Sequence, residues 1–469
     1  MYGVQSDSPP SPSPADASLP VTPRSRLRRL AGLLVRPFLT MLWNPGRTLL
    51  ILFLLVVIGA GVGSVGFWLW FEHELGAARE AVAQRHDMEA IRGLARCMRF
   101  RPEHPETLLL SARVARRSGA FDRAQELLDS YWRQRGDDDD LVLERLLLRA
   151  SRGEIDPLVP VFEDRIRKDD PAAPLMSEAL IIGSLHGFRI RDADQHVQAW
   201  LVREPDSPPA LWQEGRTHEL AERIPRAIDS YRRCLELDPA FDEARVRLAA
   251  LLVQQKNGQE ALPHAEYLSR RLGFDPEVEL SRARALDLLD RSGEAIAILD
   301  ELLERQPNHA EALGDRGRLA LRSKDSTLAE ELLRRAVQRD PGNLLTRYQL
   351  ALALGRNEKP EEARKENEKI AALEADLAKM KKIITEQIPR APANADLCYE
   401  VALIALRAGI PRETYRWLQN ALQIDPDHLL THRALATYHQ KMGNPVLSSR
   451  HRSIAQRLAQ TRPGTQEKQ

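Results

Sequence analysis

Histidine is the residue type whose spacing in this chain comes closest to that of a metal site. His428 and His432 stand one helical turn apart, and His439 follows seven residues later. Two imidazoles on one helix face are able to hold a transition metal. The spacing supplies no acidic or cysteine third ligand, so we interpret all three as surface histidines and expect no metal.

Acidic residues and cysteines offer little further chemistry. The run Asp137–Asp140 lacks the ligand spacing of a calcium loop and is interpreted as a solvated turn. Cys97, Cys234 and Cys398 form no C-x-x-C pair and are expected to be small core residues. The chain contains no Gly-rich phosphate loop, no G-x-S-x-G and no H-E-x-x-H. We therefore expect no enzyme, no catalytic residue and no cofactor.

A 34-residue period organises most of the chain. Small residues recur at this step at Ala90 and Ala124 and again at Ala193, Ala227, Ala261, Ala295, Ala329 and Ala363. Twelve residues before this site stands a second small site, occupied by Ala78, Ala112, Gly215, Ala249, Ala283, Gly317 and Ala351. Twelve residues after it stands a proline, at Pro102, Pro205, Pro239, Pro307 and Pro341. Small residues let two helices approach closely and proline ends a helix, so the pattern predicts stacked two-helix units.

These positions resemble the tetratricopeptide repeat family, in which the eighth and twentieth residues of a unit are small and the thirty-second is proline. The resemblance implies an all-α fold, a right-handed α-solenoid of about eleven helix-turn-helix repeats, of the membrane-anchored bacterial type. The units would begin near Phe71, Pro105, Asp140, Pro174, Pro208, Asp242, Pro276, Ala310, Leu344, Ala395 and Leu429. The third unit departs from the pattern, with Val159 at the small site and one extra residue, as do the last two, with Thr414 and Ser448.

The resemblance also implies where a partner would bind. In this family the inner surface is formed by the second, fifth, ninth, twelfth and thirteenth residues of each first helix. Such positions carry Arg113, Arg116, Arg117, Trp212, Arg216, Arg284, Arg318, Arg322, Tyr348, Arg356, Tyr399 and Arg407. Guanidinium groups bind carboxylates or phosphates through paired hydrogen bonds, and aromatic rings stack on a partner. The alternative is that these arginines pair with neighbouring acids such as Glu277 and Asp287.

The period is interrupted by a 17-residue helical insertion near 364–394. The insertion carries one apolar stripe with steps of three and four residues, formed by Ile370, Leu373, Leu377, Met380 and Ile384. Two heptads are too few for a stable isolated coiled coil. We expect the stripe to pack on the adjacent unit, and docking of a partner helix is the alternative.

An uncharged segment, residues 48–71, precedes the repeats. At 1.5 Å per residue it would span roughly 36 Å, against about 30 Å for a hydrocarbon core. Trp43 before it and Trp68 and Trp70 near its end are typical of interfacial aromatic belts. The segment predicts a single-pass transmembrane helix. A cleaved signal peptide is the alternative, but no Ala-x-Ala-like site follows the apolar run.

The flanks of this segment predict its orientation. Residues 1–47 contain six arginines and no lysine, whereas the other side opens with Glu72 and Glu74. Positive charge stays in the cytoplasm, so the N-terminus would be cytoplasmic and the repeats would lie outside the inner membrane. The predicted organisation is a disordered Pro/Ser-rich and then basic tail (1–47), the helix (48–71), the solenoid (72–462) and a disordered end (463–469). Within the first tail, Leu30–Trp43 would lie in the inner headgroup layer.

Together these features predict a membrane-tethered scaffold that binds a protein or peptide in the concave groove of the solenoid. The alternative function is an accessory subunit of an envelope biosynthesis or secretion complex that binds a polysaccharide or lipid intermediate. The formal net charge of +1 gives no reason to expect a nucleic acid partner. Gly59 and Gly63 form a G-x-x-x-G step, which makes a homodimer a further hypothesis.

Overall fold

Helices account for the regular structure of the described part of the chain, which in this computed structural model comprises residues 45–442 and 444–461. No strand occurs within these residues. The predicted all-α fold is therefore confirmed. The expectations for 1–23, Leu30–Trp43 and 463–469 concern segments outside the described residues.

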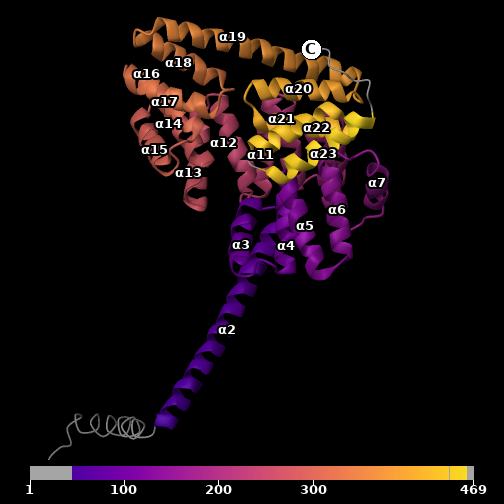
Figure 1. Cartoon of the computed structure of the whole chain (residues 1–469). Coiled ribbons are helices and arrows are strands. Elements are labelled where there is room, and N and C mark those ends of the chain that lie inside the picture. Colours follow the sequence, from indigo (N-terminus) through magenta and orange to yellow (C-terminus); the bar gives the residue numbers. More distant parts are fainter. Residues whose placement is uncertain (1–44, 443, 462–469) are drawn as a thin grey trace, which may run out of the picture. The chain divides into compact units, whose positions relative to one another are not determined.

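The helices run in order along the chain (Figure 1). The first half contains α2 (Pro45–Ala83), α3 (Asp87–Phe100), α4 (Pro105–Arg117), α5 (Phe121–Arg135), α6 (Asp139–Ser151), α7 (Val159–Arg167), α8 (Ala173–His186), α9 (Ile190–Arg203), α10 (Pro208–Leu220), α11 (Ile224–Leu237), α12 (Asp242–Gln254) and α13 (Gly258–Leu272). The second half contains α14 (Pro276–Leu288), α15 (Ser292–Arg305), α16 (Ala310–Arg322), α17 (Ser326–Arg339), α18 (Leu344–Arg356), α19 (Pro360–Lys382), the π-helical η1 (Ile383–Gln387), the 3-10 helix η2 (Ile388–Arg390), α20 (Ala395–Arg407), α21 (Pro411–Ile424), α22 (Leu429–Lys441) and α23 (Pro445–Thr461).

The chain divides into two compact parts between His73 and Glu74. In the first part, α2 begins at Pro45, and its large apolar side chains from Leu49 to Leu69 are largely exposed. One helical stretch among the described residues, Leu52–Ala83, is long and apolar enough to cross a membrane by length and composition, with a mean hydropathy of 2.3 in its most apolar window. A helix of suitable length therefore lies where the sequence predicted one spanning helix.

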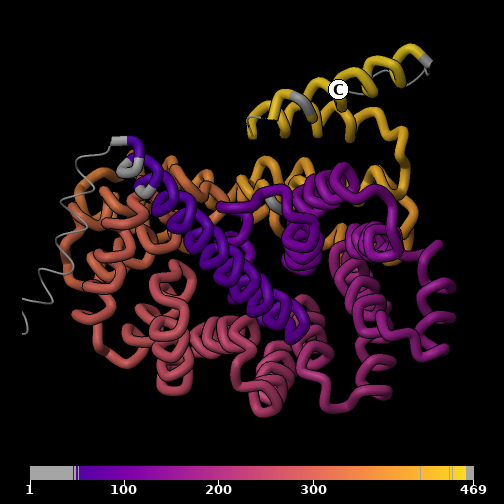
Figure 2. Tube along the Cα trace, turned by 90° about the horizontal axis from the view of Figure 1, so that it is seen from below, coloured from indigo at the N-terminus to yellow at the C-terminus, as the bar shows by residue number. Residues whose placement is uncertain are grey.

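The second part, Glu74–Gln469, consists of helix pairs that follow one another along a curved path (Figure 2). We number the pairs as units: the end of α2 with α3 is unit 1, α4 with α5 is unit 2, and so on to α22 with α23, unit 11. Within a unit the two helices pack on each other, as α10 does on α11 and α16 on α17. First helices of successive units also touch, as α8 touches α10 and α14 touches α16. The stacked first helices therefore form one face of the solenoid.

Contact between the two helices of a unit explains the small residues. Ala193, Ala227, Ala261, Ala295 and Ala329 are all completely buried. At the other small site, a Cβ atom on Gly215 would lie 2.3 Å from a ring carbon of Tyr231, and one on Gly317 would lie 2.7 Å from Leu333. Glycine stands at these two places because the facing side chain fills the space that an alanine methyl group needs in other units.

The turn between the two helices of a unit has its own 34-residue period. One residue in each turn adopts a positive φ, the left-handed conformation that ends a helix: Arg85, Gly119, Gly153, Phe188, Glu222, Lys256, Asp290, Lys324, Glu358 and Gly409. The step from Gly153 to Phe188 is one residue longer than the 34-residue period and therefore contains the extra residue. The helix α6 begins at Asp139 rather than at the predicted Asp140, so the extra residue lies within unit 3 and not before it. The insertion lies in the step from Glu358 to Gly409.

The insertion lengthens α19, which extends past α18 towards α20 (Figure 1). Ile370 and Leu373 of its stripe are buried, and Met380 and Ile384 pack against a cluster that includes Val401 and Trp417 of unit 10. This packing agrees with the expectation that the stripe contacts the adjacent unit.

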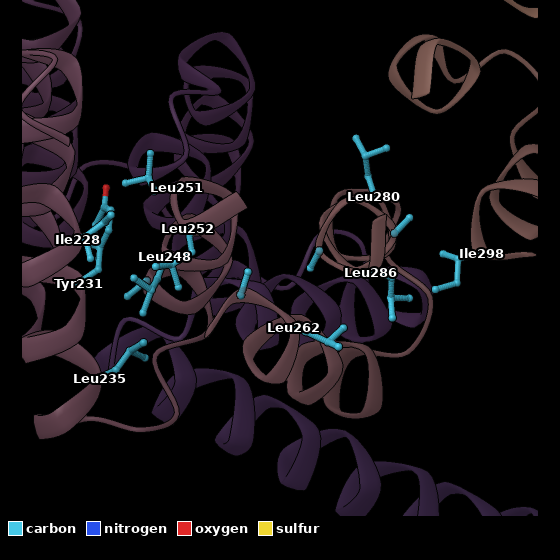
Figure 3. Packing of buried hydrophobic residues seen from close by; sticks show 14 of the residues in the cluster. Ile228, Tyr231, Leu235, Leu248, Leu251, Leu252, Leu262, Leu280, Leu286 and Ile298 are labelled. Carbon is cyan, nitrogen blue, oxygen red and sulfur yellow. The ribbon is translucent and has the colours of Figure 1, made fainter. Parts of the chain in front are cut away.

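The largest cluster of buried apolar side chains extends over units 5 to 8 (Figure 3). Tyr231 and Leu248 contribute from units 5 and 6, and Leu286 and Ile298 contribute from unit 7. Each unit completes its core only against its neighbours, as expected of a repeat protein.

Replacing Gly215 by alanine tests this packing. We expect Gly215→Ala to lower the free energy of unfolding by about 1–3 kcal/mol, because the buried Tyr231 ring must move. Gly293→Ala in α15 is the matched control, since a Cβ atom there meets nothing within 4 Å. The control should change stability by at most about 1 kcal/mol, in the stabilising direction. Urea unfolding followed by circular dichroism measures both, and equal effects of the two substitutions would contradict this explanation.

Candidate binding groove

One cavity of about 810 Å³ lies against the first helices of units 4 to 6. Glu178 and Ile182 of α8, Trp212 and Arg216 of α10, and Glu243 of α12 line this wall. Glu178, Ile182, Trp212 and Arg216 occupy fifth and ninth positions of their units, where the family resemblance places a groove. Of the predicted groove residues, Arg117, Trp212 and Arg216 line the cavity, and the other nine do not.

Unit 1 forms the opposite wall of the cavity. Arg85, Asp87, Met88 and Ile91, at the start of α3, line it. His86 Nε2 lies 2.8 Å from a carboxylate oxygen of Asp238, and the Met88 backbone N–H donates to Glu243 at 2.6 Å. Unit 1 therefore folds back onto unit 6, although more than 150 residues separate the contacting groups.

The cavity contains a buried group of opposite charges centred on Glu178. Glu178 is 2% exposed, and one of its carboxylate oxygens lies 3.5 Å from Arg85. Burial opposes ionisation of this carboxyl, but the guanidinium groups of Arg85, Arg117, Arg116 and Arg216 hold its pKa below the usual range. Its other oxygen, Oε2, is buried and accepts no hydrogen bond from the described residues.

Arg117 and Arg116 belong to the same group of charges and are also buried. Arg117 donates to Asp87 and to the backbone oxygen of Val82, the latter at 3.1 Å. Arg116 donates to Glu144 at 3.3 Å. These arginines were predicted to face a partner, and the structure places them under the surface beside internal acids. Their role in binding a partner stays a prediction.

Arg216 differs from the other arginines of the cavity. Burial lowers the pKa of its guanidinium, which donates to the amide oxygen of Gln213 at 3.2 Å and lies 5.9 Å from the Trp212 ring centre. No carboxylate of the described residues forms an ion pair with it. Trp212 itself rests on Tyr231 and Phe241, with ring centres 5.3 and 5.9 Å apart.

The remaining predicted arginines form pairs along the face of the first helices. Arg113 binds Glu144 at 2.7 Å and Asp140 at 3.1 Å. Arg284 binds Asp315 at 2.6 Å and Glu311 at 2.9 Å, and Arg318 and Arg322 share Asp287. Arg407 binds Asp376 at 2.8 Å, and Arg356 donates to the backbone oxygen of Leu321 at 2.7 Å.

The two predicted aromatic residues of the later units take different environments. Tyr348 is 47% exposed, and its hydroxyl donates to Glu374 of the lengthened α19 at 2.6 Å. Tyr399 is half-buried, with its ring centre 5.6 Å from that of His428. Tyr348 is thus the more accessible of the two to a partner.

A second contact between distant units involves α21. The Trp417 ring stacks on the Phe188 ring with a centre-to-centre distance of 4.6 Å, and the guanidinium carbon of Arg416 lies 4.0 Å from the centre of the Phe188 ring. The Tyr415 hydroxyl donates to Asp122 at 2.8 Å. Phe188 has a positive φ of 55°, an unfavourable conformation for a large side chain, so these contacts hold it in place. Unit 10 is thereby fastened to units 2 and 4.

Sequence reasoning missed Arg85, Asp87, Glu178 and Glu243. Glu178 and Glu243 stand at the fifth and second positions of their units, so the repeat frame would have found them if acids as well as arginines had been considered. Arg85 and Asp87 belong to the turn and second helix of unit 1. No local signal indicates that this segment reaches unit 6.

The other sequence candidates form no metal site. Among the described residues, no group of three or more His, Cys, Asp or Glu side chains is placed to hold a metal ion. The expectation of surface histidines is wrong for His432 and His439, which are 4% and 6% exposed because the last helix, α23, covers them. His432 and His451 face each other with their Nδ1 atoms 2.9 Å apart. Asp138 caps α6 by accepting from Leu141 N–H at 2.8 Å, and the three cysteines are buried.

Comparison with known proteins places the repeats in a family. A sequence profile of the tetratricopeptide repeat matches residues 280–343, which comprise most of units 7 and 8. Units 7 and 8 are therefore tetratricopeptide repeats. No curated protein matches the sequence.

Several solved structures are similar to parts of this chain. MamA protein is 19% identical, with a TM-score of 0.30, over 37% of this chain and 94% of its own. A tetratricopeptide repeat protein from Parabacteroides merdae is 14% identical, with a TM-score of 0.29, over 54% of this chain and 93% of its own. Human IFIT1, solved as a dimer with m7Gppp-AAAA, is 14% identical, with a TM-score of 0.39, over 75% of this chain and 89% of its own. At such low identities and scores, none of these likenesses carries an argument about function.

The cavity makes stability depend on pH through Glu243. Burial first, and then the nearby Asp87, raise the pKa of this carboxyl from 4.5 to about 7. The unfolded chain therefore loses its proton at a lower pH than the folded chain, so the folded state loses stability as the pH rises from about 4.5 to about 7. We expect Glu243→Gln to remove this loss, since a glutamine oxygen still accepts from Met88 N–H.

Unfolding by urea at pH 5 and pH 8 measures the effect. The free energy of unfolding of Glu243→Gln, relative to that of the natural protein, should be about 1–3 kcal/mol higher at pH 8 than at pH 5. Glu236→Gln on the exposed side of α11 is the control and should show no such gain. An equal gain in both variants would mean that Glu243 is not the titrating group.

Proposed function

We propose that this protein is a membrane-tethered scaffold that binds a protein or peptide along the face formed by its stacked first helices. The observation that carries the proposal is the contact between the first helices of successive units, as α14 touches α16 and α16 touches α18. A continuous helical face offers a partner a large area, which single units lack. Fold alone does not define the partner, so the side chains on this face must do so.

Three arginines on this face support the proposal by their geometry. Asp287 and Asp315 hold Arg284, Arg318 and Arg322 in a group on α14 and α16. Each side chain remains 32–48% exposed. Guanidinium groups that are already oriented lose less entropy when they bind an acidic group of a partner.

The tether is α2, and its orientation rests on the flanking charges. We propose that the N-terminus is cytoplasmic and that the repeats lie on the outer side of the inner membrane, because six arginines precede the apolar segment and two glutamates follow it.

Protease protection tests this orientation. Protease added to intact spheroplasts should digest the repeats and spare a tag placed at the N-terminus. Disrupted spheroplasts, in which the tag also becomes accessible, are the control. Digestion of the tag while the repeats stay protected would overturn the orientation, and release of the intact chain by alkaline carbonate would overturn the tether.

Site-specific photocrosslinking in membranes of the native host tests partner binding. A photoreactive residue in place of Tyr348, on a first helix, should give a defined crosslinked protein. The same residue in place of Val202, which is 80% exposed on a second helix, should not.

Arg284, Arg318 and Arg322 changed together to Ser should weaken the Tyr348 crosslink and reduce its sensitivity to salt. The control variant has the same change to Ser at three arginines that are exposed on second helices, Arg191, Arg233 and Arg339. Equal crosslinking at both sites, or equal effects of both triple variants, would contradict this surface assignment.

A further inference from the structure

The cavity lined by units 1, 2, 4, 5, 6 and 10 has the features of a small-molecule site. Its volume of about 810 Å³ lies in the range of ligand pockets, and unit 1 closes a side that an open groove would leave to solvent. Trp212, Phe241, Ile182 and Met88 provide apolar lining, and nine charged side chains, most of them paired with one another, also line the cavity. A ligand with an apolar body and one charged group would match this lining.

The ion pairs of the cavity identify the sign of that charge. Arg85 lies beside Glu178, Arg117 binds Asp87, and Arg247 binds Glu219. Arg416 binds Glu413 at 2.5 Å. The guanidinium of Arg216 lines the cavity and, among the described residues, donates a hydrogen bond only to the neutral Gln213. Arg216 is half-buried, and although Glu178 lies in its surroundings, no acid binds its guanidinium directly. An anionic ligand group would supply this direct partner.

The environment of Glu178 supports the same sign. This carboxylate is buried among Arg85, Arg116, Arg117 and Arg216, and its Oε2 atom accepts no hydrogen bond from the described residues. The site therefore already holds one internal carboxylate, which shares the arginines with any anion that enters.

We propose that this cavity binds a small organic carboxylate, with its carboxylate against Arg216 and its apolar body against the Trp212 ring. The inference goes beyond the proposed scaffold function, because the ligand occupies the cavity that unit 1 closes and not the continuous face of first helices. The carboxylate belongs to a free organic acid or to the C-terminus of a peptide, and the two sources share the same chemistry.

Isothermal titration calorimetry on the full chain in detergent micelles tests the proposal. The probes are 3-phenylpropionate and its neutral amide, which have the same apolar body, and each is also titrated into empty micelles. We expect saturable binding of the acid and at least about tenfold weaker binding of the amide, since the charged hydrogen bond is lost. No saturable heat from the acid at about 10 mM, or equal affinity for acid and amide, would overturn the proposal.

Two substitutions should act in opposite directions. Arg216→Gln should weaken binding of 3-phenylpropionate at least about tenfold, because it removes the free guanidinium. Glu178→Gln should strengthen binding, because it removes the internal carboxylate that shares the arginines. Arg226→Gln, exposed on α11 of the same unit, is the control and should leave the affinity unchanged. Thermal unfolding of each variant shows whether it is folded.

The same titration distinguishes the two sources of the carboxylate. N-acetyl-Gly-Gly-Phe carries a C-terminal carboxylate beside an aromatic ring, and its C-terminal amide is the matched control. Where 3-phenylpropionate binds in a way that depends on Arg216, the tighter of the two acids identifies the source. If Arg226→Gln weakens binding as much as Arg216→Gln does, the proposal fails. Because purified protein is used, this outcome is independent of whether a crosslinked partner is found in membranes.

Discussion

The close contact between the two helices of each unit is the constraint on which the rest of the solenoid depends. This contact requires that the residues facing each other share a limited volume. Gly215 faces the large ring of Tyr231, and Ala249, at the same position of the next unit, is itself buried. Interiors packed to this density tolerate an exchange of volume between facing side chains but no net addition. Small residues therefore recur once per unit because the two helices of each unit lie close together there.

Stacking of units that satisfy this constraint produces a face of first helices, and contacts between distant units then close part of it. Unit 1 reaches unit 6 through Met88 and Glu243, and unit 10 reaches unit 4 through Trp417 and Phe188. Met88 and Trp417 belong to second helices and Phe188 to a turn, whereas Glu243 belongs to a first helix. A groove that would otherwise be open becomes a cavity with buried charges. Such charges are costly to bury and add little net stability.

The arginines at the predicted groove positions are of two kinds, those that pair with acids and those that do not. Arg318 and Arg322 share Asp287, one of the acids that the sequence offered as an internal partner. Arg216, by contrast, lines the cavity with only neutral groups as its direct partners. Spacing along the helix is the same for both kinds, because every ninth position is equivalent in the repeat. The surrounding units decide which guanidinium is neutralised.

The sequence by itself determined the all-α fold, the 34-residue units and the place of the interruptions, because these depend on contacts between residues at most one unit apart. It also determined that Ile370 and Leu373 would be buried, since an apolar stripe of that period has one face. Only the tertiary structure decided that His432 and His439 are covered, that Arg116 is internal and that Arg85 meets Glu178. Small rotations between successive units accumulate along the solenoid, and no local pattern encodes their sum. Which distant units meet is therefore a property of the whole chain, and the cavity exists only where they do.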